Sequence, residues 1–236
     1  MLSIIVPVLD DADHLERLLP HLRSECPDAD VLVVDGGSGD RTPLIARGWP
    51  DVRYLVGERG RARQMNAGAR AARGDVLLFL HADTRLPPGA SVAIVRALED
   101  PAVASGRFDV RFCNPHWAFR MIAALMNWRS RLTGIATGDQ AIFVRRQVFE
   151  ALGGFRDIPL MEDVELCARL KRCGRTGCLR QRVVTSSRKW EREGIVRTIV
   201  LMWALRLLYF FRVDPMRLDR WYYGSPPARP LAPGSR

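Results

Sequence analysis

The alternation of short apolar runs with helix-forming segments is the feature that most restricts the fold of this chain. Val31–Val34 and Val76–Leu80 are unbroken apolar runs, which is typical of strands buried on both faces of a sheet. Between such runs, apolar residues recur at helical spacing, as at Leu15, Leu18, Leu19 and Leu22. Strands that alternate with helices form a mostly parallel sheet, so we expect an α/β fold with helices on both faces.

The second half of the chain is less regular. We expect strands at Val103–Phe112 and Gln140–Arg145, and helices at His116–Leu132 and Asp163–Cys173. No repeat or linker divides the chain, which predicts one domain over residues 1–194. Its halves would be 1–84 and 85–194, followed by a helical segment, 195–223, and a Pro- and Gly-rich tail, 224–236, expected to be disordered.

Composition narrows the class of partner. The formal charge is +10, yet Lys171 and Lys189 are the only lysines among 36 basic residues. This arginine bias is weak evidence for nucleic acid, and a diphosphate is an equally good anionic partner. The five cysteines are irregularly spaced, which disfavours a zinc ribbon or a disulfide framework. No secretory signal opens the chain, so a cytoplasmic protein is expected.

The most apolar segment is Ile195–Val213, which contains Arg206, with Arg197 and Arg212 on either side of its middle. These charges disfavour a membrane-spanning helix. Two interpretations stay open: a helix packed on the domain, or a helix lying in a membrane surface with its arginines reaching the headgroups.

Polar residues follow the predicted strands where a parallel sheet would place a ligand. His81 and Asp83 end the strand Val76–Leu80, Asp35 ends the strand Val31–Val34, and Glu162 and Asp163 open a helix. Each acid could simply cap a helix or open a turn. The alternative is a ligand site, because open α/β sheets bind ligands at the carboxyl ends of their strands. Asp83 would then be a hard oxygen ligand for Mg²⁺ or Mn²⁺.

A loop entering the next helix carries Arg59, Arg61, Arg63, Gln64 and Asn66. Arginines and free N–H groups at a helix start suit a phosphate, although a solvated basic face is the simpler interpretation of any single arginine. The turn "GGSGDR" lacks the G-x-G-x-x-G spacing of dinucleotide-binding enzymes. A hydride-transferring enzyme is therefore disfavoured.

Five motifs in order resemble family-2 glycosyltransferases of the GT-A fold, over roughly residues 2–190. They are "SIIVPVLDDA", "VVDGGSGDRT", "GRARQMNAGARAARGDVLLFLHADTRLP", "GDQAIFVRRQVFEALGGF" and "MEDVELCARLKRCG". Within that family, L-H-A-D-T, G-D-Q-x-I-F and S-S-R-x-W resemble a small bacterial subgroup, some members of which are assigned to arsenosugar biosynthesis. The chain departs from the family at two positions: Gly36 replaces the second acid of a pair, and His81 replaces the first acid of the metal motif.

The resemblance implies a Rossmann-like GT-A domain that transfers a hexose-type sugar from a nucleotide-sugar donor to a small-molecule, lipid or glycan acceptor, with inversion and with Mg²⁺ or Mn²⁺. It implies that Asp163 is the catalytic base with Glu162 beside it, and that Asp83 holds the metal. The implied donor contacts are Pro7, Val8, Asp35, Arg61, Arg63, Asn66, His81, Ala82, Arg188 and Trp190. The implied acceptor contacts are Gly138, Asp139 and Gln140. Neither nucleic acid nor an obligate protein partner is implied.

Two rival functions stay open. A nucleotidyltransferase would share the nucleotide-binding sheet, but it would open with a glycine-rich loop and a lysine, which "VPVLDDADHL" lacks. A non-catalytic protein of the same fold that binds anions or a membrane surface is the second rival, and the replacements at Gly36 and His81 favour it. Intact Asp83 and Asp163 argue against that rival.

Overall fold

A computed structural model describes residues 1–223. The strands are β1 Leu2–Val8, β2 Asp30–Asp35, β3 Val52–Val56, β4 Val76–Phe79, β5 Val103–Phe112, β6 Ile142–Arg145 and β7 Arg175–Thr185. The helices are α1 Ala12–Glu25, α2 Thr42–Arg47, α3 Arg61–Ala71, α4 Ala90–Glu99, α5 Trp117–Thr133, α6 Arg146–Ala151, α7 Glu162–Leu170, α8 Arg188–Glu193, α9 Ile195–Phe210 and α10 Pro215–Tyr223, with a 3₁₀ turn, η1, at Gly138–Gln140.

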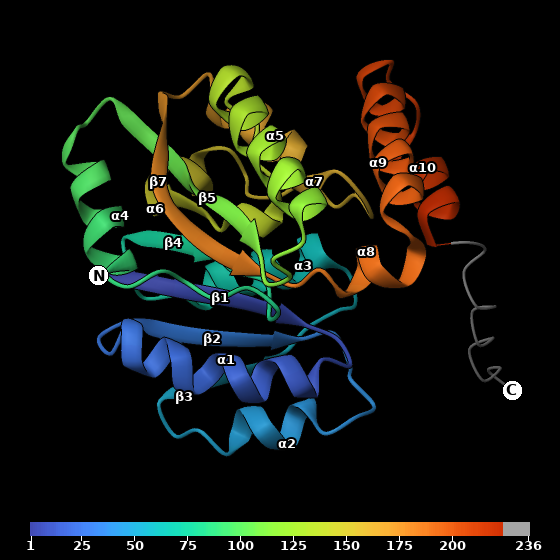
Figure 1. Cartoon of the computed structure of the whole chain (residues 1–236). Helices are drawn as coiled ribbons and strands as arrows, with labels where there is room; N and C mark the ends of the chain where they lie inside the picture. The colour runs from blue at the N-terminus through green and yellow to red at the C-terminus, as the bar shows by residue number, and fades with distance from the viewer. Residues whose placement is uncertain (224–236) are drawn as a thin grey trace, which may run out of the picture.

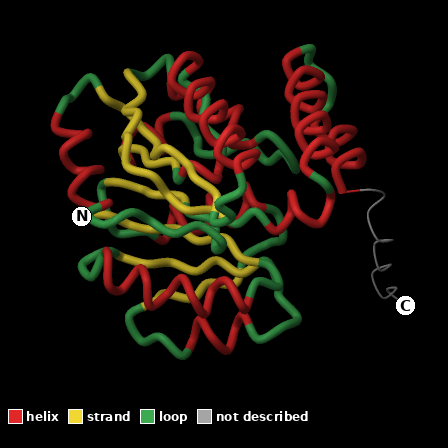
Figure 2. Tube along the Cα trace, in the orientation of Figure 1, coloured by secondary structure: helices red, strands yellow, loops and turns green. Residues whose placement is uncertain are grey.

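All seven strands form one sheet in the order β3-β2-β1-β4-β6-β5-β7. The first four strands in this order run parallel to one another, β6 runs antiparallel to both β4 and β5, and β7 runs parallel to β5. Figures 1 and 2 show this sheet between helices, with α1 and α2 on one side and α5 beside β5. The predicted single α/β domain with a mostly parallel sheet is confirmed.

Alternation along β1 explains why both faces of the sheet are covered. Ile4 and Val6 pack on one face with leucines of α1, while Ile5 packs on the other with Met65 of α3 and Leu166 of α7. All three β1 residues are fully buried. Burial on both faces is why the strand sequences read as continuous apolar runs instead of alternating ones.

Several predicted boundaries were wrong. The strand predicted from Gln140 begins at Ile142, because the Gln140 side chain completes a capping box with Thr137 and forms η1. The helix predicted to end at Cys173 ends at Leu170.

The predicted helix Ile195–Val213 ends earlier than expected. It stops at Phe210, and α10 begins at Pro215 after Arg212 takes a left-handed φ of 61°. Proline lacks the N–H that a helix interior needs, but the first turn of a helix does not use that donor. Pro215 is therefore well suited to begin a new helix. The predicted disordered tail, 224–236, lies outside the described residues.

Candidate active site

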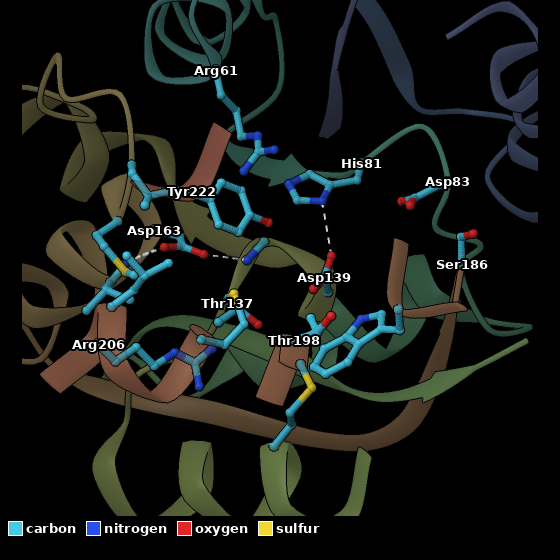
Figure 3. A pocket seen from close by; sticks show the side chains of 18 of the residues that line it. Arg61, His81, Asp83, Thr137, Asp139, Asp163, Ser186, Thr198, Arg206 and Tyr222 are labelled. Atoms are coloured by element: carbon cyan, nitrogen blue, oxygen red, sulfur yellow. Dashed lines mark hydrogen bonds and ion pairs between the residues drawn. The ribbon is translucent and has the colours of Figure 1, made fainter. Parts of the chain in front are cut away.

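A cavity of about 620 Å³ lies beyond the carboxyl ends of β1 and β4. Its walls come from the turn after β1, the residues after β4, η1 and the start of α7. Helix α5 and the C-terminal helices α8, α9 and α10 complete it. Figure 3 shows that side chains from these distant segments point into one space. The sheet edge that the sequence predicted for a ligand is therefore where the cavity lies.

The structure divides the predicted site residues into two sets. Those that line the cavity are Arg61, His81, Asp83, Gly138, Asp139, Glu162, Asp163, Arg188 and Trp190. Those that do not line it are Pro7, Val8, Asp35, Arg63, Asn66, Ala82 and Gln140.

His81 and Asp139 join two of the predicted motifs. His81 Nδ1 lies 3.3 Å from Asp139 Oδ1, with 19% of the histidine side chain exposed. Burial lowers the pKa of His81, but the contact with Asp139 and the charge of Asp83 together raise it, so the net pKa lies above its ordinary value. For Asp139, burial raises the pKa, but the contact with His81 and the charges of Arg61 and Arg206 together lower it below its ordinary value. Both shifts favour a charged pair.

Asp83 faces the cavity and makes few hydrogen bonds to other protein groups. Its carboxylate accepts one hydrogen bond, from the hydroxyl of Thr84 at 3.2 Å. Burial raises its pKa, while nearby His81 acts in the opposite direction. Asp83 therefore has free oxygen lone pairs, and burial disfavours its negative charge. A bound cation would accept the lone pairs and stabilise the charge. Within residues 1–223, no three His, Cys, Asp or Glu side chains gather as a complete metal site.

Asp163 lies at the start of α7 and is fixed by the backbone. Its Oδ2 accepts a hydrogen bond from the N–H of Gly138 at 2.8 Å, and its Oδ1 accepts one from Val164 at 2.7 Å. The helix dipole favours an anion at this end. Asp163 is thus held against η1 with its carboxylate in the cavity wall (Figure 3).

Glu162 has a different environment from its neighbour. Its side chain is 3% exposed and lies 3.3 Å from Nη1 of Arg61. Burial raises its pKa, and Arg61 acts in the opposite direction. This contact ties the start of α7 to the start of α3, so Glu162 positions Arg61 at the cavity.

Asp35 is buried in the turn that follows β2. Its Oδ1 accepts hydrogen bonds from the backbone of Gly37 and from the N–H and hydroxyl of Ser38, and its Oδ2 accepts one from the hydroxyl of Tyr54. Four hydrogen bonds fill the usual capacity of a carboxylate. In this structure Asp35 shapes the glycine-rich turn, and it is 1% exposed.

Two other predicted donor contacts, Arg63 and Asn66, bind protein groups. Arg63 pairs with Asp157 and Glu58 at the surface. The amide of Asn66 both donates to and accepts from the backbone of Phe155.

The buried amide of Gln140 donates to Ser130 at 3.0 Å. Gln140 thereby holds η1 against α5, and its side chain stays out of the cavity.

The segment after β7 closes one side of the cavity. Trp190 lines it and also packs edge-on against Phe112, with ring centroids 5.7 Å apart. Trp190 therefore packs on the domain and is also exposed to the cavity. Arg188 is exposed and also lines the cavity.

Sequence reasoning missed several cavity residues on the helices. Arg129 of α5, and Arg206 and Thr198 of α9, line the cavity, as does Tyr222 of α10. The available signal was Arg206, a lone charge inside the most apolar segment. In the sequence alone, this charge argues against a membrane-spanning helix and does not indicate a site residue.

Comparisons with known proteins identify the family of the chain. The model of "Glycosyl transferase family 2" matches residues 3–153. A PGL/p-HBAD biosynthesis glycosyltransferase of Mycobacterium tuberculosis is 31% identical over 166 residues, which cover 66% of this chain and 63% of the relative. An undecaprenyl-phosphate 4-deoxy-4-formamido-L-arabinose transferase of Pseudomonas syringae is 27% identical and covers 66% of this chain and 50% of that protein. The chain thus spans between half and two thirds of these relatives.

Solved structures resemble the fold over most of the chain. A mannosyltransferase of Pyrobaculum calidifontis in complex with GDP-Man and Mn²⁺ superposes with a TM-score of 0.63 at 25% identity, covering 78% of this chain and 56% of that one. TarS of S. aureus in complex with UDP gives a TM-score of 0.61 at 16% identity, covering 78% and 60%. The second likeness shows the fold alone.

Proposed function

The chain belongs to glycosyl transferase family 2, and from that premise we propose that it transfers a sugar from a nucleotide-sugar donor to an acceptor hydroxyl, with inversion at the anomeric carbon. The observation that carries this proposal is that Asp83 and Asp163 face the same cavity. The two carboxylates have different surroundings, which suits them to different tasks. Asp83 has free lone pairs, whereas Asp163 is fixed beside η1, which carries the proposed acceptor contacts.

Asp83 fits a divalent metal ion. A half-buried carboxylate with one weak hydrogen bond and no ion pair within residues 1–223 is a hard oxygen ligand that is free to bind a cation. Mg²⁺ and Mn²⁺ are held in such sites by one or two carboxylates, with substrate phosphates and water completing the shell. When bound, the cation would offset the charge that develops on the leaving diphosphate. The Mn²⁺ in the mannosyltransferase complex supports this assignment.

Asp163 would act as the general base. The acceptor hydroxyl gives its proton to Asp163 as its oxygen bonds to the anomeric carbon. The bond from that carbon to the diphosphate oxygen breaks on the opposite face, and the electron pair leaves with the nucleoside diphosphate. A positioned base of this kind contributes ~10²–10⁴-fold to the rate.

Positive side chains would hold the donor. Arg61, positioned by Glu162, and Arg188 line the cavity and would bind the diphosphate. His81 would hydrogen-bond the donor while paired with Asp139. The remaining proposed donor contacts do not line the cavity in this structure: Pro7, Val8, Asp35, Arg63, Asn66 and Ala82. Their role in donor binding stays a prediction, as does that of Gln140 in acceptor binding.

Calorimetry with donors tests the proposal. UDP-, GDP- and dTDP-sugars would be titrated into the full chain with and without Mn²⁺, and into the variants Asp83→Ala and Asp75→Ala. Asp75 is an exposed carboxylate that pairs with the N-terminus and serves as the control. We expect one donor to bind only with Mn²⁺ and only when Asp83 is present. Absence of binding by every donor would contradict the proposal and favour a non-catalytic protein of this fold.

We also propose peripheral contact with a membrane. Helix α9 exposes one apolar stripe, made of Val196, Val200, Trp203, Leu207 and Phe210. Among residues 1–223, no helix has the length and apolar character needed to cross a bilayer. An apolar stripe on a short helix with arginines at its edges is typical of a helix that lies in the interface. All five cysteines are free, which supports the cytoplasmic side.

A further inference from the structure

Two arginines of the cavity have no hydrogen-bond or ion-pair partner among the described residues. Arg129 of α5 and Arg206 of α9 both line the cavity. Nε and Nη2 of Arg129 and Nε of Arg206 are buried and lack any hydrogen-bond partner. Neither guanidinium forms an ion pair within residues 1–223. Such groups are rare in folded proteins, because a buried donor without an acceptor has lost its hydrogen bonds to water and gained none in exchange.

The two guanidinium groups also repel each other. Burial lowers the pKa of Arg129 to about 10, and the positive charge of Arg206 acts in the same direction. Burial likewise lowers the pKa of Arg206, while Asp163 and Asp139 act in the opposite direction. An anion between the two arginines would supply the counter-charge and the hydrogen-bond acceptors together.

This pair lies apart from the region proposed for the metal and the diphosphate. In Figure 3, Arg206 and Asp83 lie on opposite sides of the view, with Asp139 between them and Asp163 on the same side as Arg206. Asp163 is among the charges that act on both arginines. An anion bound there would therefore sit on the acceptor side of the proposed base.

The wall beside the arginines is apolar. Ile122, Leu125 and Met126 of α5 and Ile199, Met202 and Trp203 of α9 line the cavity. Leu125 and Trp203 are also 50% and 62% exposed. They belong to two exposed stripes, Trp117, Met121, Leu125, Trp128 and Leu132 on α5, and the α9 stripe described above. The cavity therefore continues into an apolar surface, which suits a ligand with an apolar part.

We propose that Arg129 and Arg206 bind an anionic group of the acceptor, and that the acceptor is an amphiphile whose apolar part lies against α5 and α9. The proposal rests on the proposed function, which supplies the reacting hydroxyl next to Asp163. The anion anchors the acceptor, so that this hydroxyl reaches the base while the apolar part stays outside the polar region. No other charged pair within residues 1–223 combines unpaired buried donors with a position in the cavity.

Three probes separate the parts of this ligand. Octyl phosphate carries both parts, octyl glucoside has the apolar part alone, and inorganic phosphate has the anion alone. Each probe would be titrated into the full chain and into the variants Arg129→Gln, Arg206→Gln, Arg206→Lys and Arg120→Gln. The two octyl compounds would be kept below their critical micelle concentrations. Arg120 is an exposed arginine of α5 outside the cavity lining and serves as the control. Melting temperatures would verify that each variant is folded.

We expect octyl phosphate to bind the native chain at least ~10-fold more tightly than either other probe. Each glutamine variant should lose ~10-fold or more, since hydrogen bonds to charged groups have effects of this size. Arg206→Lys should retain part of the affinity, and Arg120→Gln should match the native chain. Equal binding of octyl phosphate and octyl glucoside would overturn the proposal, as would equal binding of octyl phosphate and inorganic phosphate.

Donor titrations distinguish the two proposals. If Arg129→Gln or Arg206→Gln abolishes Mn²⁺-dependent donor binding, the arginines bind the donor diphosphate and the acceptor proposal is wrong. If octyl phosphate binds as expected but no donor binds the native chain, the anionic site stands and the glycosyltransferase proposal fails.

Discussion

The backbone N–H of Gly138 donates a hydrogen bond to Oδ2 of Asp163 over 2.8 Å. This bond joins η1 to the start of α7, two segments that the sequence separates widely. The same glycine faces His81 on its other side, because a Cβ at Gly138 would lie 2.3 Å from Nε2 of that histidine. Gly138 is therefore the point where the proposed base and the end of β4 meet.

Replacement of Asp163 should affect turnover far more than donor affinity. Asp163→Asn keeps the shape of the side chain but cannot accept the acceptor proton. We expect the turnover number to fall by ~10²–10⁴-fold, while the calorimetric dissociation constant for the donor changes by less than about threefold. Asp75→Asn, at an exposed surface ion pair with the N-terminus, is the control. A loss of donor affinity as large as the loss of turnover would contradict the role of Asp163 as base.

A methyl group at Gly138 should displace His81. Gly138→Ala places its Cβ within 2.3 Å of the imidazole, and the side chain must move away from Asp139. We expect weaker donor binding with little change in melting temperature. Gly39→Ala is the matched control, because its added Cβ meets nothing nearer than 3.9 Å. Equal effects of the two variants would show that the Gly138 contact with His81 does not matter.

The apolar stripe of α9 should control binding to lipid. Val200 and Phe210 are 61% and 78% exposed. We expect the double variant Val200→Asp with Phe210→Asp to lose most of its sedimentation with vesicles of anionic lipid, because charged side chains are excluded from the acyl region. Val92→Asp, at an exposed valine of α4, is the control. Unchanged sedimentation of the double variant would place the contact elsewhere.

Tyr54 should make stability depend on pH in the alkaline range. Burial and the hydrogen bond to Asp35 raise the pKa of Tyr54 to about 12 from its usual value of 10.0. Between these values the folded chain keeps a proton that the unfolded chain has released. The stabilisation is therefore complete below pH 10 and is lost as the pH rises towards 12.

Urea unfolding at pH 8 to 11 tests this dependence. Tyr54→Phe should be less stable than the native chain at pH 8, by roughly 1–3 kcal/mol, since a buried carboxylate loses a donor. The difference should shrink at pH 11, because the variant lacks this titration. A constant difference across the range would contradict the assignment.

The unpaired arginines should reduce stability in the absence of a ligand. Arg129→Met replaces a buried charge and its unsatisfied donors by an apolar side chain of similar length, next to the apolar wall of α5. We expect the melting temperature to rise. Arg120→Met, at an exposed position of the same helix, should leave it unchanged. A lower melting temperature for Arg129→Met would indicate that Arg129 supports the fold.

Local patterns predicted most of the sheet and the place of the site. Continuous apolar runs identified β2 and β4, and polar residues after them identified the edge where the cavity lies. Boundaries failed where side chains made local hydrogen bonds, as Gln140 does with the backbone of Thr137. Such capping depends on which side chains meet in space, and the pattern of apolar residues does not encode it.

The sequence by itself determined the α/β class and most of the strands, and it singled out Asp83 and Asp163 as candidates, because periodicity and turn chemistry act between near neighbours. Only the tertiary structure decided which of those polar side chains share a space. It buried Asp35 within its own turn and brought Arg129 and Arg206 together from α5 and α9. Their charges act on each other only because two helices distant in sequence pack around one cavity, and burial there removes the water that would otherwise screen them.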